Sequence, residues 1–255
     1  MESLVAIVVP TYNEAENLPD LVDRLFALGI PNTKLVVVDD GSPDGTGKLV
    51  MDLARRHDGR IELIQRGRKM GLGTAYVAGF SRALNMGAEY ILQMDADLSH
   101  APEYIPEMLE KLSSADVVVG SRYVPGGDAV ESWSLMRRSL SSIGNMGIRA
   151  ISGVRVKDAT AGFKAFRAAV ISSMDLNRFR CKGFGFQAEM AFACELAGYK
   201  VVEHPIVFEE RHRGYSKMSM LIVFEALRRL ALFALAHIHF NEPLASFRQY
   251  PFQPL

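Results

Sequence analysis

The chain has 255 residues, of which 49% are hydrophobic and 23% are charged. This is the composition of a folded globular protein with a sizeable core, and it excludes global disorder. The 29 Lys and Arg residues balance the 29 Asp and Glu residues, so no overall field draws the protein onto nucleic acid or anionic lipid. The two cysteines, Cys181 and Cys194, have neither CxxC nor zinc-type spacing, which favours a reducing compartment.

Targeting and membrane-spanning signals are weak. The short apolar run at the N-terminus follows an acidic residue rather than a basic region, so we expect no signal peptide. The stretch 218–240 is apolar, but Glu225, Arg228 and Arg229 interrupt it, so we expect no transmembrane helix there.

The first half of the chain alternates short β-branched runs with segments of helical periodicity. This alternation predicts an α/β fold with a mostly parallel central sheet, in which ligands bind at the carboxyl edge of the strands. The expected strands are 5–9, 35–38, 61–64, 90–94 and 117–119, and the expected helices are 17–28, 46–56, 74–86 and 102–112.

The second half is less regular. We expect helices at 139–151, 168–176 and 187–197, and a strand at 201–208 that Pro205 favours as an edge strand. The predicted organisation is a domain over 1–215, an amphipathic helix over 216–240 and a loose tail over 241–255. The amphipathic helix either lies in a membrane interface or packs on the domain.

Two glycine-rich segments resemble phosphate-binding motifs but fail their requirements. The segment 41–49 lacks the first glycine of a P-loop, and Leu49 replaces the metal-binding hydroxyl after Lys48. The segment starting at Gly71 lacks the third glycine of a dinucleotide fingerprint and follows a basic loop. Neither a P-loop nor a Rossmann dehydrogenase is therefore expected.

Acidic pairs follow two of the predicted strands. Asp39 and Asp40 follow one strand, and Asp95 and Asp97 follow another, so both pairs should lie at the same edge of the sheet. Two carboxylates at such a position can converge on Mg²⁺ or Mn²⁺ and leave coordination positions for diphosphate oxygens. The alternative for 95–97 is a solvated turn that caps the following helix.

Basic residues are gathered late in the chain. Guanidinium groups bind phosphate at two points, so these residues could form a phosphate clamp, although they could equally be ordinary surface charges. No Ser-His-Asp arrangement or metal-type His pair is evident, so hydrolase activity has little support. The candidate cations are Arg122, Arg137, Arg138, Arg211, Arg213 and Lys217.

Several motifs resemble those of family 2 glycosyltransferases of the GT-A fold, which bind nucleotide sugars. These motifs are PTYNE at 10–14, VDDGSPDGT at 38–46 and DADLSH at 95–100. The segments 120–123, 158–164, 183–189 and 211–217 resemble dolichol-phosphate (polyprenol-phosphate) mannose synthases more narrowly. The resemblance runs from about residue 4 to residue 240.

The resemblance implies roles for individual positions. Asp40 would read a base or ribose donor group, Asp95 and Asp97 would bind the divalent cation, and Ala96 would line the sugar nucleotide, with Ser216 a minor contributor. Asp97, Arg122, Arg137, Arg211 and Lys217 are the implied catalytic set, in which the four cations surround the donor diphosphate and the acceptor phosphate. The nucleotide would be held by Pro10, Tyr12, Glu14, Val38 and Asp40.

Two departures from the family pattern concern the site. Ser99 stands where some members have a Gln able to reach the metal, so the third ligand is either Ser99 or water. The segment 141–145 reads SSIGN where many relatives have SRGGN, so one cation is missing.

The resemblance implies transfer of mannose from GDP-mannose to a polyprenyl (dolichyl) phosphate with inversion. The alternatives are a polyprenyl-phosphate glucosyl or other glycosyl transferase that uses a UDP-sugar, and an inactive scaffold subunit. A polysaccharide-forming enzyme is disfavoured because Trp133, the single tryptophan, is not in a QxxRW setting. We expect a cytoplasmic protein, peripheral at the cytoplasmic face of a membrane, with a possible small membrane-protein partner and no nucleic acid.

Overall fold

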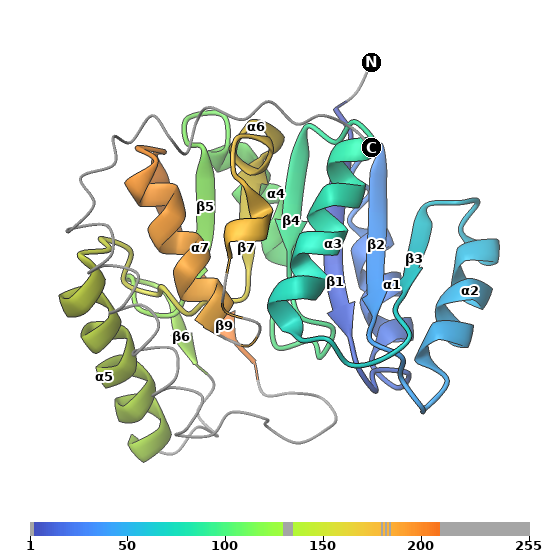
Figure 1. Ribbon diagram of the computed structural model, residues 1–255, viewed down its shortest axis with the longest axis horizontal. Helices are drawn as coiled ribbons and strands as arrows, with labels where there is room; N and C mark the ends of the chain where they lie inside the picture. Colours follow the sequence, from blue (N-terminus) through green and yellow to red (C-terminus); the bar gives the residue numbers. More distant parts are fainter. Residues whose placement is uncertain (1–2, 130–134, 180, 182, 184, 210–255) are drawn as a thin grey trace.

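Figure 1 shows the computed structural model, which describes residues 3–129, 135–179, 181, 183 and 185–209. Its centre is a seven-stranded sheet with the order β3-β2-β1-β4-β7-β5-β8. Every neighbouring pair is parallel except the two pairs that β7 makes with β4 and β5. The strands are β1 (Val5–Thr11), β2 (Thr33–Asp39), β3 (Ile61–Gln65), β4 (Tyr90–Gln93), β5 (Val117–Ser121), β7 (Lys164–Arg167) and β8 (Val201–Pro205).

Helices cover both faces of this sheet (Figure 1). Successive side chains of β1 point to opposite faces, so Ala6 and Val8 join one core cluster while Ile7 and Val9 join the other. α3 (Leu72–Asn85), α6 (Ala168–Ser172) and α7 (Gly185–Leu196) contribute to the first cluster. α1 (Leu18–Ala27), α2 (Thr46–Arg56) and α4 (Ile105–Lys111) contribute to the second. Burial on both faces explains why the strands are continuous apolar runs.

Helix α3 lies unusually close to the sheet. A Cβ atom at Gly79 would lie 2.2 Å from Cγ1 of Val8, so only glycine allows this contact. The approach also brings Tyr76, on the same helix, beneath the carboxyl end of β4. Tyr76 stacks on Phe80 and Phe186 with ring centres 5.8 and 5.7 Å apart.

Most of the predicted elements are confirmed. Helix α2 has the bounds expected from the sequence, and β8 lies at the edge of the sheet, as Pro205 suggested. The expected helix over 102–112 begins as the 3-10 turn η1 (Pro102–Tyr104), and the one over 139–151 is the longer α5 (Leu135–Ser152).

Three features of the second half differ from the expectation. The strand expected over 201–208 is two strands, because β9 (Val207–Phe208) leaves the main sheet to pair with β6 (Asp128–Ala129). β6 and β7 were not predicted. The helix expected over 168–176 ends at Ser172 and is followed by η2 (Leu176–Arg178).

The helix expected over 216–240 and the tail over 241–255 lie outside the described residues. Among the helices that the structure describes, none combines the length and the hydropathy needed to cross a membrane.

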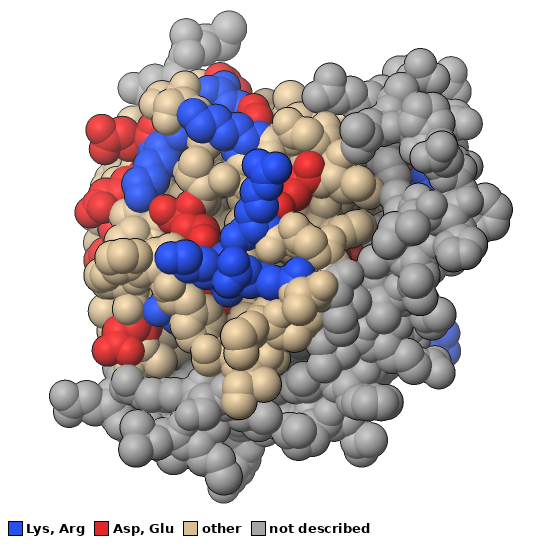
Figure 2. Space-filling model, turned by 90° about the vertical axis from the view of Figure 1, so that its left-hand side faces the viewer, with Lys and Arg blue, Asp and Glu red and all other residues tan. Residues whose placement is uncertain are grey.

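Figure 2 views the molecule from the left-hand side of Figure 1, where Lys and Arg side chains gather near the centre of the face among Asp and Glu side chains.

A cavity of about 560 Å³ lies between the end of α5 and the start of β8, and Arg155, Lys200 and Glu195 line it. The Glu195 carboxylate accepts the backbone N–H groups of Arg155 and Val156 at 2.8 and 3.0 Å. None of the expected site residues whose side chains the structure describes lines this cavity.

Candidate active site

The carboxyl ends of the parallel strands β1, β2, β4 and β5 meet at the lower edge of the sheet in Figure 1, as predicted. The loops after β1 and β2 are joined by side chains of the 42–46 segment. Ser42 Oγ accepts the backbone N–H of Asn13 at 2.9 Å, and Thr46 Oγ1 accepts that of Glu14 at 3.1 Å. The hydroxyl side chains that follow Asp40 in the sequence therefore hold the loop after β1 in place. The family resemblance assigned them no role.

The residues expected to hold the nucleotide lie around these loops. Pro10 and Val38 face each other in the β1–β2 register, but Val38 has no exposed surface and belongs to the core. Tyr12 and Glu14 are half-buried, and Glu14 accepts a hydrogen bond from Asn17 Nδ2 at 2.8 Å. The structure therefore brings Pro10, Tyr12 and Glu14 to the surface of the edge and leaves Val38 beneath them.

Asp40 is held by the loop that follows β3. Its Oδ1 atom pairs with the guanidinium of Arg66, and its Oδ2 atom accepts the backbone N–H groups of Met70 and Gly71 at 3.0 and 3.1 Å. Arg66 also donates to Thr74 Oγ1 at 2.8 Å. Asp40 thus fastens a neighbouring loop to the end of β2, a role that the sequence did not reveal.

Asp95 and Asp97 follow β4 at the same edge. Asp97 is 3% exposed, and its Oδ1 atom accepts the backbone N–H and the hydroxyl of Ser99 at 3.1 and 2.6 Å. Leu98 between them has a φ of +62°, a left-handed conformation that is rare for a side chain of this size. The turn after β4 is therefore fixed by a local hydrogen-bond pair at the cost of some backbone strain.

Tyr76 donates a hydrogen bond to Asp95 Oδ1 at 3.3 Å. Complete burial, together with the neighbouring Asp95 carboxylate, raises the pKa of Tyr76 well above its ordinary value. The phenol consequently keeps its proton and remains a donor to Asp95 at neutral pH.

The buried side chain of His100 contacts the backbone of the same turn. Its ring lies 5.3 Å from the Phe163 ring and 5.2 Å from the Phe208 ring, and its Nδ1 atom accepts the backbone N–H of Asp95 at 3.3 Å. Burial lowers the pKa of His100, so the neutral tautomer with the proton on Nε2 is the one that fits. The sequence placed His100 within a motif but gave it no role.

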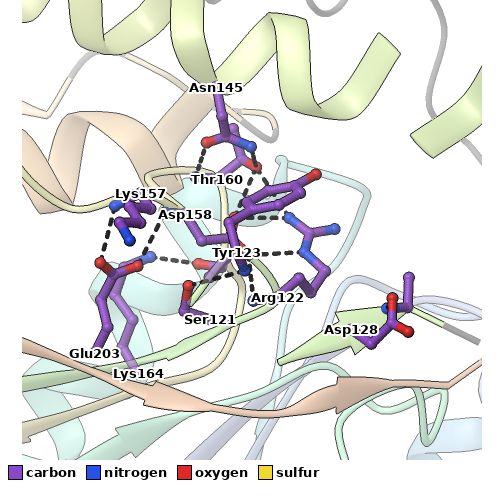
Figure 3. Close-up of polar contacts among 12 residues, drawn as sticks. Ser121, Arg122, Tyr123, Asp128, Asn145, Lys157, Asp158, Thr160, Lys164 and Glu203 are labelled. Carbon is purple, nitrogen blue, oxygen red and sulfur yellow. Dashed lines mark hydrogen bonds and ion pairs between the residues drawn. The ribbon is translucent and has the colours of Figure 1, made fainter. Parts of the chain in front are cut away.

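Figure 3 shows the ion pair between Arg122, at the end of β5, and Asp158. Arg122 Nε and Nη2 each donate to one carboxylate oxygen at 2.7 Å, and the backbone N–H of Arg122 adds a third bond at 3.1 Å. The side chains are 9% and 0% exposed. Burial alone would lower the pKa of Arg122, but the Asp158 carboxylate outweighs it and raises the pKa above its ordinary value.

A further set of contacts holds the loop that carries Asp158 (Figure 3). Glu203 of β8 accepts the backbone N–H groups of Lys157 and Asp158 at 3.0 and 3.1 Å. Asn145 of α5 exchanges two hydrogen bonds with Thr160 at 3.0 and 3.2 Å. Asn145 is the last residue of the SSIGN segment, so this segment supports the Asp158 loop.

Lys164, the first residue of β7, is fully buried. Its Nζ atom donates to Gln187 Oε1 at 3.1 Å and to the carbonyl oxygen of Ala161. Burial lowers the pKa of Lys164 to about 7, although the Asp158 carboxylate acts in the opposite direction. The sequence did not single out this residue.

The donor atoms at the end of β4 fit a hard divalent cation. Carboxylate oxygens are the ligands that Mg²⁺ and Mn²⁺ prefer. Over the described part of the chain, no group of three or more His, Cys, Asp or Glu residues could hold a metal ion by itself. The pair Asp95 and Asp97 therefore suits a cation that takes its other ligands from diphosphate oxygens and water. The Ser99 hydroxyl donates to Asp97, so Ser99 orients this carboxylate.

Of the six candidate cations, the structure describes the side chain of Arg122 and leaves five outside the described part, among them Arg138 of helix α5. Arg137 lies in helix α5, but its side chain is outside the described part. Arg211 and Lys217, with Ser216, belong to the undescribed segment 210–255, as do Arg213 and the rest of that loop.

Residues 6–174 match the family described as Glycosyl transferase family 2. The chain belongs to this family. It is 43% identical over 226 residues to polyprenol monophosphomannose synthase of Mycolicibacterium smegmatis, covering 88% of this chain and 84% of that protein. It is also 43% identical over 232 residues to undecaprenyl-phosphate mannosyltransferase of Micrococcus luteus, covering 91% and 94%. Dolichol-phosphate mannosyltransferase of Pyrococcus furiosus is 38% identical, with 89% of this chain and 62% of that protein covered.

Solved structures of other glycosyltransferases share the fold of this family member. A mannosyltransferase from Pyrobaculum calidifontis, solved with GDP-Man and Mn²⁺, has a TM-score of 0.57 at 18% identity, with 96% of this chain and 78% of that chain covered. Glucosyl-3-phosphoglycerate synthase from Mycobacterium tuberculosis, solved with Mn²⁺ and UDP-Glc, has a TM-score of 0.61 at 13% identity, with 98% and 81% covered. The predicted GT-A type α/β domain is therefore confirmed.

Proposed function

We propose that this protein transfers mannose from GDP-mannose to a polyprenyl (dolichyl) phosphate, with inversion at the anomeric carbon, and so forms polyprenyl-phosphate mannose. The observation that carries the proposal is the pair Asp95 and Asp97 at the carboxyl edge of β4, in a chain 43% identical to a polyprenol monophosphomannose synthase and to an undecaprenyl-phosphate mannosyltransferase. The Pyrobaculum mannosyltransferase with GDP-Man and Mn²⁺ supports the choice of donor and of a divalent cation.

The reaction fits a site in which no described residue is an obvious general base. A phosphate monoester is already ionised at neutral pH, so its attacking oxygen has no proton to lose. His100 is the titratable ring beside the acidic pair, and its Nδ1 atom already accepts the N–H of Asp95. It is also 2% exposed. His100 therefore positions the turn, and the acceptor phosphate supplies its own nucleophile.

Each part of the site has a role in the proposed reaction. Asp95 and Asp97 would hold Mg²⁺ or Mn²⁺, which when bound neutralises negative charge on the leaving nucleoside diphosphate. Arg122, Arg137, Arg211 and Lys217 would draw together the donor diphosphate and the acceptor phosphate. Because Asp158 holds the Arg122 guanidinium at two points, Arg122 would present a fixed orientation to the phosphates rather than move to meet them. Nucleotide contacts would come from Pro10, Tyr12, Glu14, Asp40 and Ala96, with Val38 beneath them.

The lipid acceptor places the reaction at a membrane. We expect the protein to act in the cytoplasm as a peripheral protein at the cytoplasmic face, where the amphipathic segment 216–240 would lie in the interface. A small membrane protein could be a further partner of this segment.

A transfer assay tests the proposal. Radiolabelled GDP-mannose and UDP-glucose are each incubated with polyprenyl phosphate, with and without EDTA, and label is measured in the solvent-extractable lipid. The proposal predicts label from GDP-mannose that EDTA abolishes. Label from UDP-glucose alone would contradict the mannose donor and favour a polyprenyl-phosphate glucosyltransferase, and label from neither would contradict the proposed reaction.

A further inference from the structure

Lys69 lies over the ring of Tyr12. It is an exposed residue of the loop between β3 and α3, and its Nζ atom is 4.3 Å from the centre of the Tyr12 ring. At an exposed site such a cation–π contact contributes only about 0.5–1 kcal/mol. This contact alone would hold a flexible lysine weakly, so the backbone of the loop decides where Lys69 can reach.

The backbone on both sides of Lys69 is tied to the end of β2. The two residues that follow it, Met70 and Gly71, donate their N–H groups to Asp40 Oδ2 at 3.0 and 3.1 Å. Three residues before it, the backbone N–H of Arg66 donates to the carbonyl oxygen of Asp39 at 2.8 Å, and the Arg66 guanidinium pairs with Asp40 Oδ1. One buried carboxylate thereby fixes the point from which the Lys69 side chain extends.

Gly41 restricts the same loop from the other side. It has a φ of +71°, and a Cβ atom there would lie 3.1 Å from the carbonyl oxygen of Arg66 and 3.2 Å from the backbone nitrogen of Arg68. The turn after β2 and the loop after β3 are therefore in backbone contact. The backbone at Lys69 is consequently held in place by contacts between two neighbouring loops, and its side chain extends from there over Tyr12.

We propose that Lys69 is a specificity-determining residue that recognises the guanine of the nucleotide donor, an inference that rests on the proposed function. A base that stacks on an aromatic ring gains about 1–3 kcal/mol, more than the cation–π contact it would replace. A base on the face of Tyr12 therefore displaces the ammonium group. Because the backbone at Lys69 is fixed, the ammonium group remains at the edge of the stacked base.

The edges of guanine and uracil differ in what they offer to an ammonium group. Guanine carries two adjacent acceptors, O6 and N7, and Lys is a common partner of this pair. On the corresponding edge, uracil carries the single acceptor O4 beside the C5–H group, and its other carbonyl oxygen, O2, lies on the far side of N3. A lysine held at the edge of the base thus favours a guanine nucleotide over a uracil nucleotide.

The test compares nucleotide affinities in the presence of Mn²⁺ by isothermal titration calorimetry, with GDP and UDP as the probes. Lys69→Met removes the charge and keeps the length of the side chain. We expect this variant to weaken GDP binding about tenfold and UDP binding less than about twofold. Lys69→Arg should keep most of the preference for GDP. Arg68→Met removes the same charge from the neighbouring exposed position and should leave the ratio of the two affinities unchanged.

Three outcomes would overturn the assignment of Lys69. Equal weakening of GDP and UDP binding would place the ammonium group at the phosphates. Unchanged binding of both would reduce the Tyr12 contact to a surface feature, and an equal effect of Arg68→Met would show a general effect of charge. Wild-type protein that binds neither GDP nor UDP would instead contradict the proposed function.

Discussion

Arg122 and Asp158, 36 residues apart in the chain, form a two-point ion pair that is almost completely buried. The pair joins the end of β5 to the loop that leads into β7. Tyr123 and Phe208 lie 5.3 and 5.2 Å from the guanidinium carbon, so aromatic rings limit the access of water to it. The Arg122 charge is therefore stable in these buried surroundings only while the Asp158 carboxylate compensates it.

Asp158→Asn should destabilise the protein strongly. It leaves the Arg122 charge buried without a counter-charge, which typically costs about 3–5 kcal/mol. Urea denaturation of the wild type, Asp158→Asn, Arg122→Gln and the double variant measures the coupling. We expect the double variant to lose less free energy of unfolding than the sum of the two single variants. Strict additivity would show that the pair is energetically independent despite its geometry.

Tyr76→Phe should weaken metal binding while leaving the fold intact. The variant removes the phenolic donor to Asp95 and keeps the ring that stacks between Phe80 and Phe186. Loss of a hydrogen bond to a metal ligand typically costs about 10–100-fold in affinity, and we expect the lower end for a bond of this length. The Mn²⁺ dissociation constant from electron paramagnetic resonance is the readout.

The matched control is Tyr199→Phe, which removes a hydroxyl group paired with Ser173 near the amino end of β8. It should leave Mn²⁺ affinity unchanged. If both variants bind Mn²⁺ as the wild type does, Tyr76 does not position Asp95.

Lys164 should make stability depend on pH. Burial lowers its folded-state pKa to about 7 from the ordinary 10.5, so between these values the unfolded chain holds more protons than the folded protein. Stability contributed through this group therefore rises with pH from about 7 toward 10.5. The urea midpoint of the wild type should rise between pH 7 and pH 9 by more than that of Lys164→Met. Parallel profiles for the two proteins would show that the buried amine does not titrate in this window.

The first half of the fold could be predicted because its signals are local. Buried parallel strands such as β2 are continuous apolar runs, and α2 shows the helical period between two turns rich in glycine and aspartate. β7 escaped prediction because its four residues begin and end with a cation. The burial of Lys164 depends on Ala161 and Gln187, which only the tertiary structure brings to it.

The candidate site could be predicted in part for a similar reason. Asp95 and Asp97 are two residues apart at a strand end, so the sequence itself places both carboxylates at the carboxyl edge of β4. Asp40 and Arg66 are 26 residues apart, and no local pattern relates them. The sequence therefore predicted only a nucleotide-binding role for Asp40, whereas in the structure Asp40 also anchors the loop after β3. His100 had a weak signal in its position three residues after Asp97.

The most direct test of the account is the Mn²⁺ dependence of mannosyl transfer by the wild type and by Asp97→Asn. The amide keeps an oxygen that can accept the Ser99 hydrogen bonds, and it removes the negative charge that a divalent cation requires. A bound cation supplies several kcal/mol of charge stabilisation, so we expect the variant to lose about 100-fold or more in kcat, with an unchanged circular dichroism spectrum. Full activity of Asp97→Asn at the same Mn²⁺ concentration would contradict the assignment of Asp95 and Asp97 as the metal site.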